Sequence, residues 1–80
     1  MSRLSDALAH LVKGIVDHPD DVAVASFDSS RGELLEVRVH PEDLGRVIGR
    51  GGRTAKALRT IIGALADGER VRVDVVDTDH

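Results

Sequence analysis

Several residue types are absent or nearly absent from this sequence, and each absence narrows what the chain can be. There is no cysteine, which excludes disulfide bonds and thiolate metal sites. Aromatic residues make up 1% of the chain, so the core must be built from Val, Leu, Ile and Ala. No apolar run approaches the ~20 residues of a membrane span, and the first residues lack the apolar stretch of a secretory signal. We therefore expect a cytoplasmic protein that does not enter a membrane.

What remains is typical of one small globular domain. The 80 residues are 41% apolar and 31% charged, which suits a folded chain rather than a disordered one. We found no internal repeat, linker or low-complexity segment. We expect a single domain over residues 1–80, with a polar and frayed tail at about 77–80.

The charge distribution is more informative than the formal net charge of −3. Between Leu44 and Gly63 there are five basic residues and no acid, whereas the rest of the chain carries six basic residues and fourteen acids. A short basic patch on an acidic body can bind an anion locally while the body suppresses non-specific binding. The alternative is that these are ordinary solvated helix charges. The five basic residues are Arg46, Arg50, Arg53, Lys56 and Arg59.

A glycine-bracketed turn, Gly49-Arg50-Gly51-Gly52, lies within this basic segment. Glycine has no Cβ and tolerates positive φ, so backbone amides in such a turn can approach a phosphate closely. The N-terminus of a following helix adds free N–H groups and a positive dipole end. The turn therefore predicts a phosphate backbone as the ligand. The alternative is a plain helix–helix turn, but such a turn does not need three glycines and flanking arginines.

Helical periodicity is found at both ends of the chain. An apolar stripe predicts a helix at about residues 3–17, ended by His18-Pro19. Pro41 opens a short helix to about Val47, with His40 as a possible N-cap. A second stripe predicts a longer helix after the glycine turn, with Gly68 as its left-handed C-terminal residue. The two stripes are Leu4, Leu8, Leu11, Val12 and Ile15, and Ala55, Leu58, Ile62 and Leu65.

Three strands are expected between and after these helices. Residues 21–28 and 33–40 flank a turn at 29–32 and predict an antiparallel hairpin. Residues 71–75 alternate as a final strand, which a helical crossover joins in parallel to the second strand. The fold class is therefore α+β, in the order αββααβ. It is a two-layer sandwich of a three-stranded mixed sheet with the helices on one face and polar side chains on the other.

The stretch from Val47 to Thr60, with a Gly-x-x-Gly loop at Gly49–Gly52 between two helices, resembles the signature of a KH domain. The element order resembles the type II arrangement. Length, single domain and motif position together resemble KhpA, a family of small bacterial RNA-binding proteins. The resemblance covers nearly the whole chain, from the first helix to the last strand.

The resemblance implies that the loop clamps about four nucleotides of single-stranded RNA. Gly49 and Gly52 would set the loop geometry, and Arg50 and Gly51 would face the phosphates. Bases would lie in a groove lined by Val47, Ile48, Ala55 and Leu58, with the rim of the hairpin as the opposite wall. These four apolar residues have an alternative role as core.

Four basic residues flank the loop and are ranked by their distance from it. Arg53 is the best candidate for a phosphate contact because it lies beside the loop, and Lys56 is the second. Arg46 precedes the loop and is expected to flank the RNA path. Arg59 is expected to point away or to pair with an acid, because its direction on the helix has rotated.

The resemblance also implies partners and a cellular role. KhpA-like proteins act as homodimers, often alongside a larger KhpB (Jag-like) KH protein. The expected role is a post-transcriptional regulator or RNA chaperone, connected with cell shape through envelope and division control. KH domains do not need a stacking aromatic, whereas RRM and OB surfaces do, so the lack of Tyr and Trp argues against those two.

Other functions fit the sequence less well. The P-loop pattern requires glycine where Val47 lies, and the Rossmann pattern requires it where Thr54 lies. No catalytic arrangement stands out, so we expect no enzyme, no cofactor and no small-molecule substrate. A protein-interaction or dimerisation adaptor with weak or no nucleic-acid binding remains the alternative. The histidines lack metal-ligand spacing and a nearby carboxylate pattern, and we expect them to be surface residues. They are His10, His18, His40 and His80.

Overall fold

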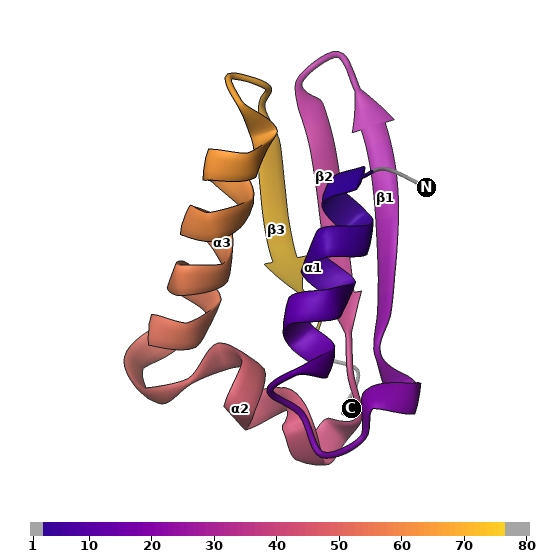
Figure 1. Ribbon diagram of the computed structural model, residues 1–80, viewed down its shortest axis with the longest axis vertical. Helices are drawn as coiled ribbons and strands as arrows, with labels where there is room; N and C mark the ends of the chain where they lie inside the picture. Colours follow the sequence, from indigo (N-terminus) through magenta and orange to yellow (C-terminus); the bar gives the residue numbers. More distant parts are fainter. Residues whose placement is uncertain (1–2, 77–80) are drawn as a thin grey trace.

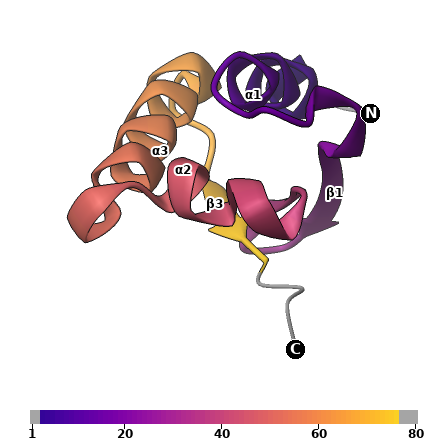
Figure 2. The same cartoon turned by 90° about the horizontal axis from the view of Figure 1, so that it is seen from below.

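The computed structural model of the chain describes residues 3–76, in which three strands form one mixed sheet (Figures 1 and 2). The main helices pack on one face of this sheet, which gives the two layers expected from the sequence. The domain measures 33 × 22 × 22 Å. The elements in chain order are α1 (Arg3–Lys13), the 3-10 turn η1 (Pro19–Asp21), β1 (Ala23–Ser29), β2 (Gly32–Arg38), η2 (Pro41–Asp43), α2 (Leu44–Ile48), η3 (Arg50–Gly52), α3 (Arg53–Ala66) and β3 (Val71–Val75).

The sheet has the order β1-β2-β3, with β2 in the middle. β1 and β2 form an antiparallel hairpin in which Ser29 pairs with Gly32, so the connecting loop is the two residues between them. β3 runs parallel to β2, with Leu35 opposite Val73. The predicted α+β class and the αββααβ order are both confirmed. The predicted tail at 77–80 lies outside the described residues.

The core lies between the sheet and the helices. Its side chains come from α1, the middle strand and the residue that follows it, α2, α3 and β3, and they are all aliphatic, as the shortage of aromatic residues requires. The opposite face of the sheet carries the exposed polar residues Arg38, Arg72 and Asp74, but it is not polar throughout, because the paired residues Phe27 (52% exposed) and Leu34 also lie on it. The buried hydrophobic residues are Leu4, Leu8, Val12, Leu35, Val37, Val39, Val47, Ala55, Leu58, Ile62, Ala66 and Val73.

The first helix is shorter than predicted. It ends at Lys13 rather than at about residue 17, because Gly14 weakens the helix. The amides of Gly14 and Ile15 bond to carbonyls three residues back, as in a 3-10 turn, rather than four residues back. These bonds join the Gly14 amide to Leu11 (3.2 Å) and the Ile15 amide to Val12 (3.0 Å). Ile15 is therefore 37% exposed and does not extend the buried stripe. The first strand also begins later, at Ala23.

The end of α3 differs from the prediction by one residue. Leu65 is 46% exposed, and Ala66 is buried in its place; the two residues lie three and four positions after the buried Ile62, so periodicity alone does not decide between them. Asp67 is the left-handed C-cap (φ 51°), and Gly68 follows with φ 91°. Within residues 3–76, none of the helices is long and apolar enough to span a bilayer.

Candidate nucleic-acid interface

The glycine turn joins α2 to α3 at one end of the molecule, the end opposite the tip of the β1–β2 hairpin (Figure 1). Its backbone explains its composition, because all three glycines have positive φ: 77° at Gly49, 64° at Gly51 and 77° at Gly52. Gly49 combines this with ψ 169°, a region that is essentially closed to other residues. Arg50 and Gly51 are exposed, and the flanking glycines are half-buried. The turn therefore lies on the surface, with its variable positions outermost.

The amides of the turn divide into bonded and free groups. The Gly49 amide donates to the Gly45 carbonyl (2.8 Å), and the Gly52 amide donates back to the Gly49 carbonyl (3.1 Å). Within residues 3–76, no hydrogen bond satisfies the amides of Arg50 and Gly51. The first turn of α3 also lacks a side-chain cap, and its N-terminus carries the positive end of the helix dipole. This arrangement can bind an anion.

The basic residues around the turn are not equivalent. Arg50, Arg53 and Lys56 are exposed, and none of them has an ion-pair partner in the part of the chain that the structure describes. Arg46 is paired instead, since its Nη2 lies 3.1 Å from Oδ2 of Asp17. Three cationic side chains beside the loop are therefore free to bind a phosphate, and Arg46 becomes a fourth if its ion pair with the exposed Asp17 breaks.

Arg59 is directed toward the sheet. Its Nε donates to the carbonyl of Val73 at 3.1 Å, and within residues 3–76 it has no acidic partner. Its side chain thereby joins α3 to the outer edge of β3. Together with neighbouring residues of β3 it lines a shallow surface depression.

The structure separates the apolar residues that were expected to line a groove. Val47 is fully buried, and Ala55 and Leu58 are 6% and 5% exposed, so these three support the loop from within the core. Only Ile48, at 38% exposed, presents apolar surface next to the loop. The strand alongside α3 is β3 rather than the hairpin rim, because β3 forms the edge of the sheet on that side (Figure 1).

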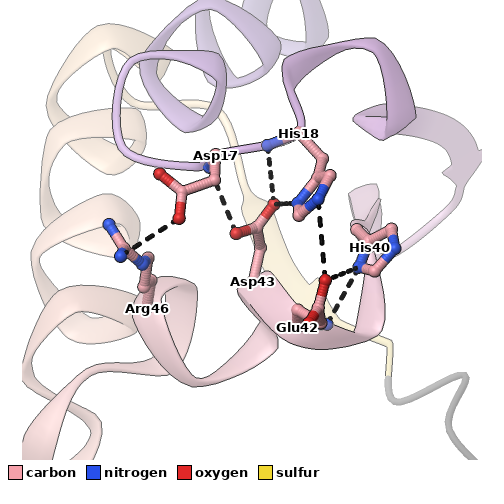
Figure 3. A network of polar contacts seen from close by, with 6 residues as sticks. All are labelled: Asp17, His18, His40, Glu42, Asp43 and Arg46. Atoms are coloured by element: carbon pink, nitrogen blue, oxygen red, sulfur yellow. Dashed lines mark hydrogen bonds and ion pairs between the residues drawn. The ribbon is translucent and has the colours of Figure 1, made fainter.

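A buried carboxylate fixes the segment that leads into the loop. Asp43, at the start of α2, is 1% exposed, and its Oδ1 accepts the backbone amide of Asp17 (3.1 Å). Its Oδ2 accepts both the backbone amide and the ring Nδ1 of His18, each at 2.9 Å (Figure 3). These bonds tie the connection after α1 to the helix that carries the glycine turn.

The same contacts set two pKa values. Burial disfavours the charged form of Asp43, but the hydrogen bonds from Asp17 and His18 outweigh it and hold the pKa of the carboxyl below its usual value. For His18, the hydrogen bond to Asp43 is the strongest influence and raises the pKa of the imidazole against the opposing effect of burial. The carboxylate of Asp43 is therefore ionised and accepts the hydrogen bond, and Nδ1 of His18 carries the hydrogen and donates it.

The structure also corrects the expectation for the histidines. His18 and His40 stack, with ring centroids 4.0 Å apart and planes inclined by 14°. His40 is the N-cap that we predicted, since its Nδ1 accepts the Glu42 amide at 3.0 Å. We did not predict the carboxylates beside His18, which are those of Glu42 and Asp43. Its partners lie more than twenty residues further along the chain, so no local pattern could reveal them.

Fold and loop together define the class of protein: the αββααβ order with a surface Gly-x-x-Gly turn between two helices is that of a type II KH domain. Comparison with known families narrows this class. The chain belongs to the KhpA/KhpB KH-domain family, whose pattern it matches over residues 5–76. This is a non-enzymatic family, so the expectation that the chain is no enzyme is confirmed.

Individual relatives agree with this assignment. The chain is 77% identical to the RNA-binding protein KhpA of Leifsonia xyli subsp. xyli, an alignment that covers 92% of this chain and 97% of the relative. It is 69% identical to the RNA-binding protein KhpA of Streptomyces coelicolor (96% of each chain) and 64% identical to that of Mycobacterium tuberculosis (94% and 92%). No solved structure is significantly similar to the chain.

Proposed function

We propose that this protein is a cytoplasmic RNA-binding protein that holds the backbone of single-stranded RNA with the loop Gly49–Gly52. The observation that carries the proposal is that the amides of two exposed residues, Arg50 and Gly51, have no partner within residues 3–76 and lie at the N-terminus of α3. Relatives that share most of its sequence are named RNA-binding protein KhpA, which supports RNA as the ligand.

In this proposal both the backbone and the side chains of the loop contact the phosphates. The amides of Arg50 and Gly51 donate to phosphate oxygens, and the guanidinium of Arg50 neutralises the charge. Arg53 and Lys56 extend the positive surface along the first turns of α3. Arg46 adds a contact when RNA displaces the exposed carboxylate of Asp17.

Bases need a surface beside the phosphate site. Ile48 offers apolar contact next to the loop, and the edge of β3 offers polar backbone groups on the flank of α3. Arg59 already bonds to one carbonyl of this edge, at Val73, so a base that approaches there meets a guanidinium held in place. The groove that we propose therefore runs from Ile48 along α3 toward β3.

The direct test replaces Arg50 and Gly51 with aspartate in one variant. Carboxylates would then face phosphates, and binding of a short single-stranded RNA, measured by fluorescence anisotropy, should be lost. The fold should persist, because a Cβ at Gly51 meets no atom within 4 Å and aspartate tolerates left-handed backbone better than most residues. Circular dichroism and thermal melting check this.

A matched control exists at the other end of the molecule. The variant Ser30→Asp, Arg31→Asp makes the same change in formal charge within the exposed hairpin turn. It should bind RNA nearly as well as the unmodified protein, because short-range phosphate contacts rather than net charge determine affinity. If the two variants bind equally well, the loop is not the site.

A second candidate function, a protein-interaction adaptor, is favoured by one observation. Ile61 and Leu65 lie four residues apart on α3 and are 42% and 46% exposed, so they present apolar side chains on one helical face. We propose that this face takes part in a homodimer or in pairing with a KhpB-like partner, which would join two loops and raise avidity for RNA. We propose that a dimer that binds RNA through two loops acts as a post-transcriptional regulator or RNA chaperone.

Sedimentation of the purified protein, with and without RNA, tests the assembly. A dimer in either condition supports the proposal, and a strict monomer in both contradicts it. The aspartate loop variant separates the two functions. A pure adaptor keeps its assembly and has no RNA binding to lose, whereas an RNA-binding dimer keeps its assembly and loses RNA.

A further inference from the structure

Three potential metal ligands from two separate segments meet beside the start of α2. His18 precedes η1, and His40 and Glu42 lie at the start of η2 (Figure 3). One ligand atom from each residue lies within 4.8 Å of the other two. His18 Nε2 is 3.6 Å and His40 Nδ1 is 3.7 Å from the same oxygen, Oε1 of Glu42.

These separations are close to those of one tetrahedral ion. Zinc binds imidazole nitrogen and carboxylate oxygen at about 2.0–2.2 Å, so two ligand atoms of one tetrahedral site are about 3.4 Å apart. The distances from the two imidazole nitrogens to Oε1 of Glu42 exceed this by only a few tenths of an ångström, and the ligand atoms of the two histidines lie within 4.8 Å of each other. The side chain of Glu42 is 73% exposed and is therefore free to make the small movement that closes the gap.

The ring of His18 is already oriented for a metal. The buried carboxylate of Asp43 accepts its Nδ1 proton at 2.9 Å, which leaves the lone pair on Nε2, the atom that faces Glu42. A carboxylate behind a histidine is the usual outer-shell arrangement of metal sites, because it fixes the tautomer and ring orientation. Asp43 is held in turn by two backbone amides, those of Asp17 and His18.

His40 would have to exchange one bond for another. Its Nδ1 lone pair accepts the Glu42 amide at 3.0 Å, and its ring is stacked on that of His18. An ion that binds Nδ1 takes this lone pair and parts the two rings, because both ring planes must then point at the metal. Binding is therefore coupled to a local change at the start of η2, which the Glu42 amide reports.

We propose that His18, His40 and Glu42 form a binding site for a divalent transition-metal ion, with Zn²⁺ as the type ligand and water completing the coordination. Two imidazoles and one carboxylate, without thiolate, suit zinc and its neighbours rather than Ca²⁺ or Mg²⁺, which prefer all-oxygen sites. The ion would join the segment after α1 to the segment that leads into the glycine loop, in addition to the bonds of Asp43.

The test is a titration of the full, metal-free chain with Zn²⁺ by calorimetry, and with Co²⁺ by its visible absorption. We expect one saturable equivalent per chain, with a tetrahedral Co²⁺ spectrum. NMR should show a shift of the Glu42 amide at the same stoichiometry. Absence of saturable binding would overturn the proposal.

Variants assign the ligands. Glu42→Gln should weaken binding at least tenfold without disturbing the fold, because its side chain is exposed. His18→Ala and His40→Ala should do the same, and circular dichroism identifies any that unfolds. Asp43→Asn should cost about 10–100-fold through the orientation of His18.

His10 provides the control, since it is an exposed histidine of α1 outside the cluster. His10→Ala should leave the affinity unchanged. If His10→Ala weakens binding as much as His18→Ala does, or if Glu42→Gln leaves the affinity unchanged, the ions bind scattered surface histidines and the site does not exist.

Discussion

The glycines of the loop should differ sharply in their tolerance of alanine, and the structure supplies the reason. A Cβ added at Gly49 would lie 2.7 Å from the Cβ and 2.8 Å from the backbone nitrogen of Thr54, closer than real Cβ atoms come. A Cβ at Gly51 meets nothing within 4 Å. Both residues have positive φ, so only Gly49 combines backbone strain with a clash against main-chain atoms.

These two effects give the expected magnitudes. Strain at the φ and ψ of Gly49 costs about 1–3 kcal/mol, and overpacking against Thr54 adds about 1–3 kcal/mol. Gly51→Ala incurs only the left-handed penalty of about 1–2 kcal/mol, partly offset by the lower entropy of the unfolded chain. We expect Gly49→Ala to be less stable than Gly51→Ala by about 2 kcal/mol, which lowers Tm by a further 8–16 °C or so in a domain of this size.

Urea and thermal denaturation of the two variants and the unmodified chain measure the difference. Gly52→Ala is a useful third variant, because its left-handed backbone also meets no atom within 4 Å of an added Cβ. It should resemble Gly51→Ala. Equal destabilisation at all three positions would refute the reasoning, because it would mean that the contact with Thr54 does not determine the loop conformation.

Three further predictions follow from the site. RNA affinity should fall with salt at a log–log slope of about −2, since three unpaired cations surround the loop and each contributes about −0.7 on a single strand; salt-independent binding would contradict the clamp. Val47→Ala should destabilise the fold by about 2 kcal/mol because it removes buried methyl groups. Ile48→Ala should leave stability nearly unchanged and weaken RNA binding. Denaturation measures the first effect and fluorescence anisotropy the second, and the reverse result would mean that Val47 rather than Ile48 contacts RNA. With a chelator present, the free energy of unfolding that His18 contributes should be full below its ordinary pKa of 6.5 and should decline as pH rises through the raised pKa of the folded state. The contribution of Asp43 should be full above its ordinary pKa of 3.8 and should decline as pH falls through the lowered pKa of the folded state. Denaturation of His18→Ala and of the unmodified chain across pH tests the first statement, and a stability difference that grows above pH 7 would contradict it.

Periodic and local features were predictable from the sequence. The alternation of Leu35, Val37 and Val39 correctly indicated the inner face of the middle strand, because side-chain direction in a strand has a period of two. His40 followed by proline correctly indicated a cap, since cap and first turn are adjacent in the chain. The positive φ of the loop glycines also follows from local composition.

Features that depend on distant partners were not predictable. Val47 and Ile48 are both apolar and adjacent, and only the packing of α2 against the core determines that the first is buried and the second exposed. Asp43 is buried, and the backbone amides that bond to its carboxylate lie before η1, far from it in the sequence. The bond from Arg59 to Val73 required knowing that β3 is the edge strand beside α3.

The most direct test of RNA binding by the glycine loop is an NMR titration of the ¹⁵N-labelled chain with a short single-stranded RNA. We expect the largest shifts at the amides of Arg50 and Gly51, which have no partner within residues 3–76, with smaller ones along the first turns of α3 and none at the hairpin turn. Saturable RNA binding that shifts other regions and leaves those two amides unmoved would contradict this expectation.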